Sequence, residues 1–425
     1  MLEGCVRNPI LQYSDTPIFY MGNQVRPWHV LAQRDFGLFW SSLLISGIGS
    51  QLTTVALAWQ IYEITGSPLQ LGLVGLFRAL PVIVSALTGG LLADRMDRRR
   101  LLIATQLLAM ALSFLLGLLT DLGVIQVWHI YAVTFFSTAL MTFDQPTRSA
   151  MIPNLVPREH LATAFALSVT LRQTAMLAGP FVAGVVIAWA GVRWSYYLDA
   201  ASFVAVIGCL LSIRLGQVLP ATKKEPALKS ILEGFVFVRN NPLILGLLVM
   251  DTCVTFFGAY RAMMPVFAKD ILGVGAPGLG ALLGAPAMGA LVGSGVVMAL
   301  GNPRGKMRLI VSITLLYTVG LIAFALSRSF AFSFLVAFFL GGLDAMGETL
   351  RMTLIQMATP DELRGRVQGL VHVFVIGGPF MGHAQVGLVA ALVGAPGAVV
   401  AGGLIAAAVV GLMAKRITQL TAAES

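Results

Sequence analysis

The sequence predicts an all-α membrane protein in which twelve transmembrane helices form two pseudo-symmetric six-helix bundles. Composition is the first reason, because 57% of the 425 residues are hydrophobic and only 11% are charged, whereas soluble domains carry roughly a quarter charged residues. The second reason is that the apolar residues occur in runs of about 20, the length that crosses about 30 Å of hydrocarbon. The third is a sequence repeat that aligns the two halves of the chain.

Each expected span is a long apolar segment bounded by polar residues. The clearest example, Leu101 to Thr120, contains no charged residue. On this basis we expect spans near residues 36–58, 70–93, 101–122, 126–146, 163–190, 194–213, 242–268, 276–300, 307–327, 329–350, 366–392 and 397–414.

The distribution of Lys and Arg supports this placement. With these spans, 22 of the 28 basic residues lie on one side of the membrane, which the positive-inside rule identifies as the cytoplasmic side. Both chain ends are then cytoplasmic, and we expect a bacterial inner-membrane protein. The net charge of +9 therefore reflects topology rather than nucleic-acid binding. Residues 1–35 carry charges without an apolar core, so we expect no cleavable signal peptide.

The longest polar segment between spans follows the sixth span and indicates a linker between two halves. We therefore expect a cytoplasmic tail, a six-helix bundle, a cytoplasmic linker, a second six-helix bundle and a second cytoplasmic tail at residues 1–35, 36–214, 215–241, 242–414 and 415–425.

Short matches relate the two halves. Arg148 corresponds to Arg351, and the segment Gly-Pro-Phe at 179–181 recurs at 378–380. Two repeated bundles around a central cavity are a common transporter architecture, in which the halves rock about a site near the membrane midplane. The sequence therefore places the functional site between the halves.

A charged motif follows the second expected span. Residues 90–100 read GLLADRMDRRR and resemble the signature GxLaDrxGRrx of the major facilitator superfamily. The resemblance implies a cytoplasmic gate in which Gly90 permits close helix approach and Asp94 caps the positive N-terminus of a helix in the other half. Arg95 and Arg98 supply its positive charges.

The sequence departs from the signature at Asp97, where the family has glycine. The resemblance also implies that Asp144 or Arg148 completes the gate together with the arginine at 98. By analogy, we expect a second inner cluster at the end of the tenth span, made by Asp344, Glu348 and Arg351.

Further segments narrow the resemblance within the superfamily. Residues 143–150, FDQPTRSA, and 260–262, YRA, look like the branch that contains enterobactin exporters and related bacterial efflux proteins. Gly179, Pro180 and Gly184 resemble a reduced form of the exporter motif GxxxGPxxGG in the fifth helix. This motif implies a hinge, although close packing of small residues would explain it as well.

Ionisable residues within the spans are candidate functional groups, because their burial in lipid is costly. Asp251 could bind a proton or a cationic substrate group, or form a structural pair with an arginine. Arg78 could hold an anionic group such as a catecholate or carboxylate. Arg172 and His372 could line the cavity together, although a histidine in an apolar helix is more often part of a structural hydrogen bond. Asp199 is a further candidate for binding a proton or substrate, or it could only anchor a helix end.

We therefore expect proton-driven export of a siderophore or drug-like compound by a monomer, whose partners are the substrate, protons and lipid. The alternatives are an importer or a lipid or metabolite transporter of the same fold, and a transport-inactive scaffold or sensor in a larger complex. The fourth expected span contains no arginine between residues 126 and 143, unlike typical drug antiporters of the superfamily.

Enzyme classes are disfavoured. The chain has no GxxxxGK phosphate-binding loop and no GxSxG nucleophile motif. Its cysteines, Cys5, Cys209 and Cys253, are odd in number and widely spaced, which argues against a metal site or disulfide framework. We expect no cofactor and no metal.

Overall fold

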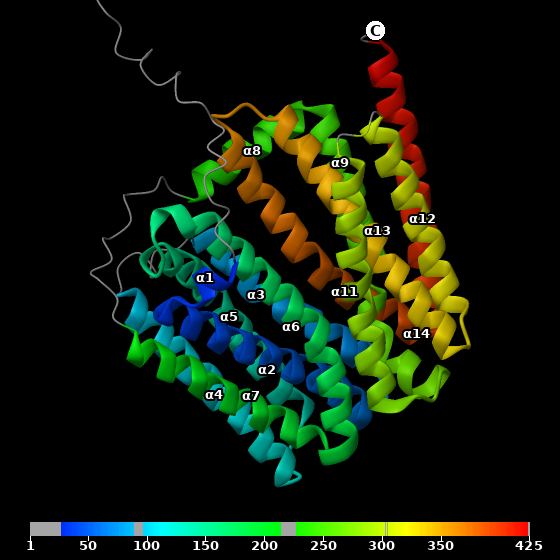
Figure 1. Ribbon diagram of the computed structural model, residues 1–425. Coiled ribbons are helices and arrows are strands. Elements are labelled where there is room, and N and C mark those ends of the chain that lie inside the picture. The colour runs from blue at the N-terminus through cyan, green and yellow to red at the C-terminus, as the bar shows by residue number, and fades with distance from the viewer. Residues whose placement is uncertain (1–26, 89–96, 214–226, 302, 304, 424–425) are drawn as a thin grey trace, which may run out of the picture.

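The computed structural model describes residues 27–88, 97–213, 227–301, 303 and 305–423 (Figure 1). Within these ranges every regular element is helical. Ten helical stretches are long and apolar enough to cross a membrane. The 25-residue α5 (Val127–Met151) is not among them, and α14 (Arg364–Ala423) contributes a single stretch. The chain is therefore an all-helical, multi-pass membrane protein.

The first group of helices matches the first six expected spans within a few residues, except that α2 continues past residue 58 and α5 past residue 146. Its elements are α1 (Pro27–Leu31), α2 (Arg34–Thr65), α3 (Pro68–Thr88), α4 (Arg98–Asp121), α5, the 3₁₀ turns η2 (Ile152–Asn154) and η3 (Arg158–His160), α6 (Leu161–Ala190) and α7 (Val192–Ser212).

Asp97 begins α4 as its N-cap. Its carboxylate accepts a hydrogen bond from the backbone N–H of Arg100 at 3.0 Å, which satisfies one of the free donors at the helix start. Its φ of −58° is ordinary for any residue. The position therefore needs no glycine, and the departure from the family signature is explained by capping.

The second group comprises α8 (Ala227–Asn240), α9 (Pro242–Phe257), η4 (Tyr260–Met263), α10 (Met264–Val266), η5 (Phe267–Ile271), α11 (Gly275–Leu300), α12 (Lys306–Leu326), α13 (Phe330–Ala358) and α14. The helix α8 lies within the expected linker and was not anticipated. Gly394, at φ 77° and ψ 160°, interrupts α14, which agrees with the expected division between residues 392 and 397.

The seventh expected span, 242–268, is confirmed as a stretch long and apolar enough to cross the membrane, Pro242–Ile271, but it is not one regular helix. After α9 the chain passes through Gly258, a 3₁₀ turn at η4, the short α10 and a π-helical turn at η5. Pro265 contributes to the break because it has no backbone N–H to donate. Non-helical backbone at membrane depth is tolerated where protein covers it or where it lines a cavity.

The helices pack mainly within the two groups, and two crossings join the groups. In the first group α7 packs on α2 and α4, and in the second α11 packs on α13 and α14 on α9. Between the groups, α3 packs along α14 and α6 along α11 (Figure 1). These two crossings place the candidate site.

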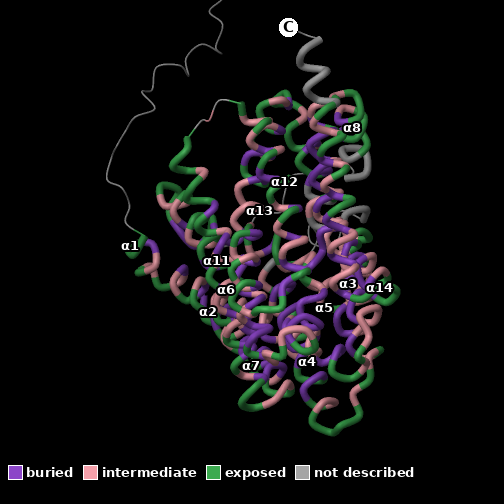
Figure 2. The backbone as a smooth tube through the Cα atoms, turned by 90° about the vertical axis from the view of Figure 1, so that its right-hand side faces the viewer, coloured by how far each residue is buried: buried purple, intermediate pink, exposed green. Residues whose placement is uncertain are grey.

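The two groups share a hydrophobic core at one end, and α3 of the first group also contacts α8 of the second. One large cluster contains residues of both groups, from Leu52 and Ala183 in the first to Phe267 and Leu279 in the second. It lies at the end opposite α8, which we call the closed end. Toward the α8 end, each group has a separate core. Figure 2 shows how buried and exposed residues alternate along the helices.

Large apolar side chains cover the outer surface, as lipid requires. Trp189 is 90% exposed at the end of α6, and Leu392 is 81% exposed. In water such exposure would be costly, whereas tryptophan at a helix end suits the interface between lipid and water.

Candidate functional site

The α6–α11 crossing is built on glycine. A Cβ added to Gly184 would lie 2.7 Å from the carbonyl oxygen of Ala276, and one on Gly280 would lie 2.3 Å from that of Pro180. A Cβ on Gly179 would meet the side chain of Gln51 in α2 at 2.3 Å. The glycines and proline predicted as a hinge thus form close helix contacts here. Their role as a hinge stays a prediction.

The α3–α14 crossing uses the same device. A Cβ on Gly72 would lie 2.7 Å from the Cα of Gly387, and one on Gly387 would lie 2.9 Å from the carbonyl oxygen of Pro68. One helical turn along α3, a Cβ on Gly75 would lie 2.4 Å from the Cβ of His383. Small residues therefore bring the backbones of both groups into direct contact.

A polar contact joins the groups at the same end. The hydroxyl of Tyr62, near the end of α2, donates a hydrogen bond to the carboxylate of Asp270 in η5. The ammonium of Lys269 lies 5.7 Å from the centroid of the Tyr62 ring, within the range of a cation–π attraction. Separation of the groups at the closed end would break these contacts.

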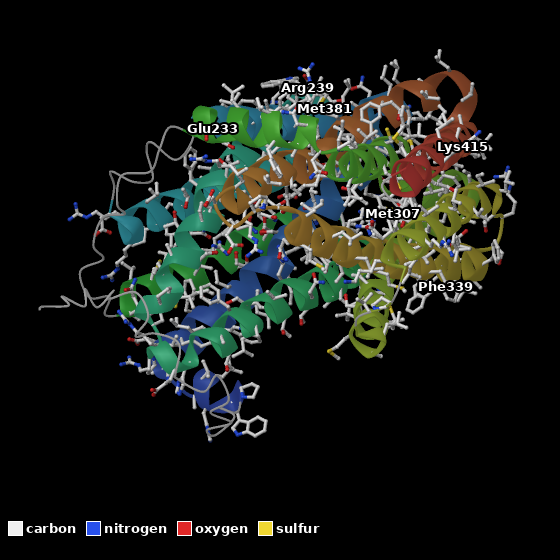
Figure 3. All side chains as sticks on the ribbon, turned by 90° about the horizontal axis from the view of Figure 1, so that it is seen from above. Glu233, Arg239, Met307, Phe339, Met381 and Lys415 are labelled. Atoms are coloured by element: carbon white, nitrogen blue, oxygen red, sulfur yellow. The ribbon has the colours of Figure 1, made fainter. Side chains whose placement is uncertain are left out.

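Among the described residues, two ion pairs toward the α8 end each join side chains of the same group. Arg148 pairs with Asp144 one turn before it in α5 at 2.5 Å, and Asp144 also accepts a hydrogen bond from Gln106 in α4 at 2.7 Å. In the second group Arg366 of α14 pairs with Glu233 of α8 at 2.5 Å. Figure 3 shows Glu233 together with Arg239 on α8, at the upper edge of the molecule in this view.

Part of the predicted gate lies outside the described structure. Gly90, Asp94 and Arg95 fall in the segment 89–96, which the structure does not describe. Arg98 begins α4, but its side chain is not described, and the side chain of His372 in α14 is likewise outside the description.

The second group contains a buried ion pair between α9 and α13. Arg351 and Asp251 approach to 2.5 Å, with side chains only 9% and 12% exposed. Gly347 makes room for the guanidinium, since a Cβ there would lie 2.8 Å from an Arg351 nitrogen. The structural pair with an arginine, which the sequence left open for Asp251, is thus present.

Asp344 and Glu348 lie on the same helix as Arg351, and both interact electrostatically with Asp251. The sequence assigned these three α13 residues to a gate cluster of their own and did not connect them to Asp251. Arg172 of α6 also acts on Glu348, and both side chains are exposed. Opposite charges from the two groups therefore face one another across solvent-accessible space.

Asp199 is a central hydrogen-bond acceptor in the first group rather than a helix-end anchor. It is 2% exposed and accepts from the hydroxyls of Thr53 at 2.7 Å and Ser113 at 2.6 Å. These bonds tie α7 to α2 and α4, which stabilises the bundle. Nearby, the Tyr196 hydroxyl donates to the amide oxygen of Gln60 at 2.7 Å.

A basic cluster lies where α3, α14 and η4 meet. Arg78 shares a face of α3 with Gly75, because residues three apart point the same way on a helix, and that face packs on α14. His383 of α14 experiences the charges of both Arg78 and Arg261. The sequence analysis did not identify His383 as a candidate. The signal available in the sequence was a histidine within an apolar span, three residues after the Gly-Pro-Phe segment at 378–380.

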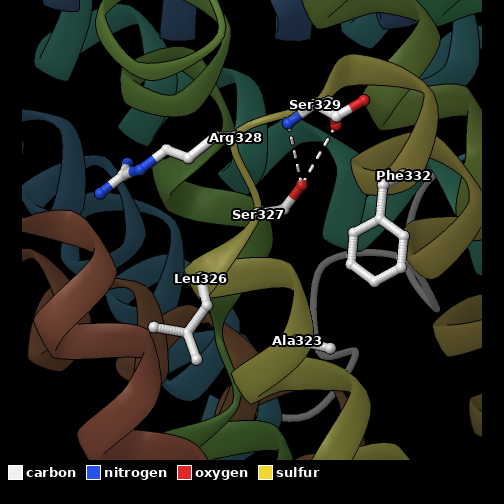
Figure 4. A pocket seen from close by; sticks show the side chains of 6 residues that line it. All are labelled: Ala323, Leu326, Ser327, Arg328, Ser329 and Phe332. Atoms are coloured by element: carbon white, nitrogen blue, oxygen red, sulfur yellow. Dashed lines mark hydrogen bonds between the residues drawn. The ribbon is translucent and has the colours of Figure 1, made fainter.

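A surface hollow lies away from these ionisable side chains. It is lined by Ala323, Leu326, Ser327, Arg328, Ser329 and Phe332, at the turn between α12 and α13 (Figure 4). The Ser327 hydroxyl bonds the backbone of Ser329, so this polar group is satisfied within the turn. The hollow contains none of the ionisable candidates.

The sequence and fold of the chain are similar to those of known transporters. The model of the transmembrane secretion effector family, within the major facilitator superfamily, matches residues 25–425. The chain belongs to this family. Enterobactin exporters from Shigella boydii serotype 18 and Escherichia coli O81 are 28% identical to it over 354 residues, which cover 81% of this chain and 82% of theirs.

Solved transporter structures share the fold at low sequence identity. A bacterial homologue of the human lysosomal transporter Spinster, in an inward-facing and unoccupied conformation, matches with a TM-score of 0.69 at 14% identity, covering 93% of this chain and 98% of that one. A bacterial homologue of the iron transporter ferroportin, in an inward-facing state, matches with a TM-score of 0.67 at 15% identity, covering 90% and 98%. Membership of a transporter family therefore identifies the chain as a membrane transport protein rather than an enzyme, and these structures show the shared fold.

Proposed function

We propose that this protein is a proton-driven exporter of the bacterial inner membrane that works by alternating access. In this proposal twelve spans form two bundles, residues 36–214 and 242–414, with the linker 215–241 and both termini in the cytoplasm. The observation that carries it is the joining of the two helix groups at one end by a shared core, while the cores at the other end are separate.

The charge distribution supports the orientation. In the expected topology, 22 of the 28 Lys and Arg residues lie on the side of the linker that contains α8, which favours the cytoplasmic side. The closed end then faces outward, and the solvent-accessible charges of Arg172 and Glu348 lie between the groups on the cytoplasmic side. A substrate would enter from the cytoplasm and leave after the closed end opens.

The substrate class we propose is a small siderophore or drug-like molecule. Support comes from relatives that export enterobactin, at 28% identity over most of both chains. The assay should therefore compare a catecholate siderophore with cationic and neutral drugs.

Asp251, with Asp344 and Glu348 beside it, is the proposed proton-binding region. Three carboxylates close together disfavour full ionisation of all three, and Arg351 offsets only part of that repulsion. A proton that binds Asp251 would release Arg351, which could then turn toward the other two carboxylates on its own helix. Because Glu348 also faces Arg172 of the other group, this rearrangement would alter the attraction between the groups and thus the conformational equilibrium.

Transport by the purified protein in liposomes with an imposed pH gradient tests the proposal. We expect substrate movement coupled to proton flux, with a pH-sensitive dye inside the vesicles as the second readout. Uptake driven in the opposite sense would support the importer alternative, and no transport of any compound would support a scaffold or sensor.

Substituting Asp251→Asn tests the assignment of the proton site. We expect loss of proton-dependent export, whereas Asp121→Asn, at an exposed pair with Arg193 near the closed end, should retain it. Glu348→Gln provides a variant without the ion-pair loss that accompanies Asp251→Asn. Unchanged, still proton-dependent export by both Asp251→Asn and Glu348→Gln would exclude the carboxylate cluster.

A further inference from the structure

We propose that Arg78, Arg261 and His383 together form a binding site for an anionic group of the substrate, such as a carboxylate or catecholate. This inference rests on the proposed transport function and specifies the substrate chemistry. The three residues come from three elements, α3, η4 and α14, and from both helix groups.

Helix packing brings the residues together. The face of α3 that carries Gly72, Gly75 and Arg78 packs along α14, with His383 against Gly75. The 3₁₀ turn η4, which carries Arg261, contacts both α3 and α14. The cluster therefore lies at a junction of three elements, beside a break in the seventh expected span. Broken helices frequently form substrate sites in transporters, because their backbone groups are free to face a cavity.

The local charge is positive. Within the described residues, Arg78 forms no ion pair with a carboxylate. His383 experiences two positive charges, those of Arg78 and Arg261. Asp344 interacts with Arg261 and offsets one of these charges, so an excess positive charge remains. A guanidinium held inside a membrane protein without a counter-ion is costly, and an anionic ligand would remove that cost.

The donor groups of these side chains suit a planar anion. A guanidinium presents a rigid fork of N–H donors that matches the two oxygens of a carboxylate or catecholate, and a neutral histidine can donate one more N–H. The Phe380 ring lies 6.2 Å from the His383 ring, edge to face, and adds an apolar surface for an aromatic ligand. A cationic substrate is disfavoured here, because the cluster carries excess positive charge and the buried carboxylate of Asp251 is already paired with Arg351.

A ligand at this place would contact both helix groups. It would bind Arg78 in the first group and His383 and Arg261 in the second, next to the close contact of α3 with α14. Its binding free energy can therefore bias the equilibrium between conformations in which this contact is made or broken. The site would thus link substrate binding to the opening of the closed end.

Direct binding of a matched pair of probes tests the site independently of transport. Saturation-transfer NMR with the purified protein compares salicylate with salicylamide, which have similar shapes but differ in charge. We expect salicylate to bind more tightly, and Arg78→Gln or Arg261→Gln to weaken its binding about tenfold, as loss of a charge-assisted hydrogen bond predicts, while salicylamide binding stays unchanged. Arg193→Gln, at the exposed pair near the closed end, is the matched control.

Arg78→Lys adds a second test that does not depend on the loss of charge. It keeps the positive charge but removes the fork, so it should recover only part of the affinity. A melting temperature near that of the unsubstituted protein shows that each variant folds. Equal binding of the two probes, or salicylate binding unaffected by both glutamine variants, would overturn the site. The binding assay distinguishes failure of this site from failure of the proposed transport function. If the site is wrong, salicylate binding fails the test while export can persist. If the transport function is wrong, specific salicylate binding can persist without export.

Discussion

The closed end depends on the absence of side chains where α6 crosses α11, and Gly184→Val should open it. A Cβ at Gly184 would lie 2.7 Å from the carbonyl oxygen of Ala276, 3.1 Å from the Cα of Pro277 and 3.2 Å from that of Gly280. These are backbone atoms of a packed helix, so a single side chain cannot move aside to relieve the contacts. The two helices must separate, and valine adds two further methyl groups to the Cβ.

The magnitude follows from the cost of overpacking. Extra methyl groups in a tightly packed contact cost about 1 to 3 kcal/mol. This cost falls on the conformation with the closed end joined, because the contact is absent once the groups separate. A bias of about 2 kcal/mol changes the ratio of the two conformations about 30-fold. Gly208→Ala in α7 is the matched control, since nothing lies within 4 Å of a Cβ there.

Electron–electron distance measurements between spin labels can detect the opening. Glu63 near the end of α2 and Arg328 before α13 are both exposed, one in each group, and can be substituted by cysteine in a background without the native cysteines. We expect Gly184→Val to add a longer distance that the control lacks. An unchanged distance distribution in a folded Gly184→Val variant would refute the argument that this crossing holds the closed end.

Three further predictions concern polar contacts. Tyr62→Phe, which removes the hydrogen bond to Asp270, should favour the open form about fivefold, measured with the same labels; no shift would mean that the bond does not stabilise closure. Arg351→Gln should lower the free energy of unfolding by about 3 to 5 kcal/mol, because it leaves the Asp251 carboxylate buried and unpaired. In denaturant titrations the double variant Arg351→Gln, Asp251→Asn should lose less free energy of unfolding than Arg351→Gln alone. An equal or larger loss in the double variant would contradict this explanation. Asp97→Ala should lower the free energy of unfolding by about 1 kcal/mol, because the N-cap of α4 is lost. Asp97→Gly should lower it by only about a few tenths of a kcal/mol. Equal losses for the two variants in the same titrations would argue against capping.

Local sequence predicted the helices well because their cause is local. An apolar run of sufficient length must form a helix in lipid to satisfy its own backbone, and the expected boundaries agree with most observed ones. The break after Phe257 was missed, since Gly258 and Pro265 in an apolar stretch are also compatible with a bent continuous helix. The helix α8 was missed because a polar segment between spans indicates a linker rather than a helix.

The functional candidates were found residue by residue, but their partners were not. The cost of burying a charge identifies Asp251, Arg78 and Arg172 from sequence alone. Nothing in the spacing shows that Asp251 meets Arg351, or that Arg78 shares a junction with Arg261, because these contacts join elements far apart in the chain. The gate motif at residues 90–95 lies outside the described structure and stays a prediction.

The sequence by itself determined that this protein is a helical membrane protein of a transporter family. Hydropathy, the distribution of Lys and Arg and the motif at 90–100 are properties of single segments, so no tertiary contact is needed to recognise them. Only the tertiary structure decided which end is closed and which charges meet. Those features depend on contacts between helices, where Gly184 meets Gly280 and Asp251 meets Arg351, and such contacts are set by the packing of the whole bundle.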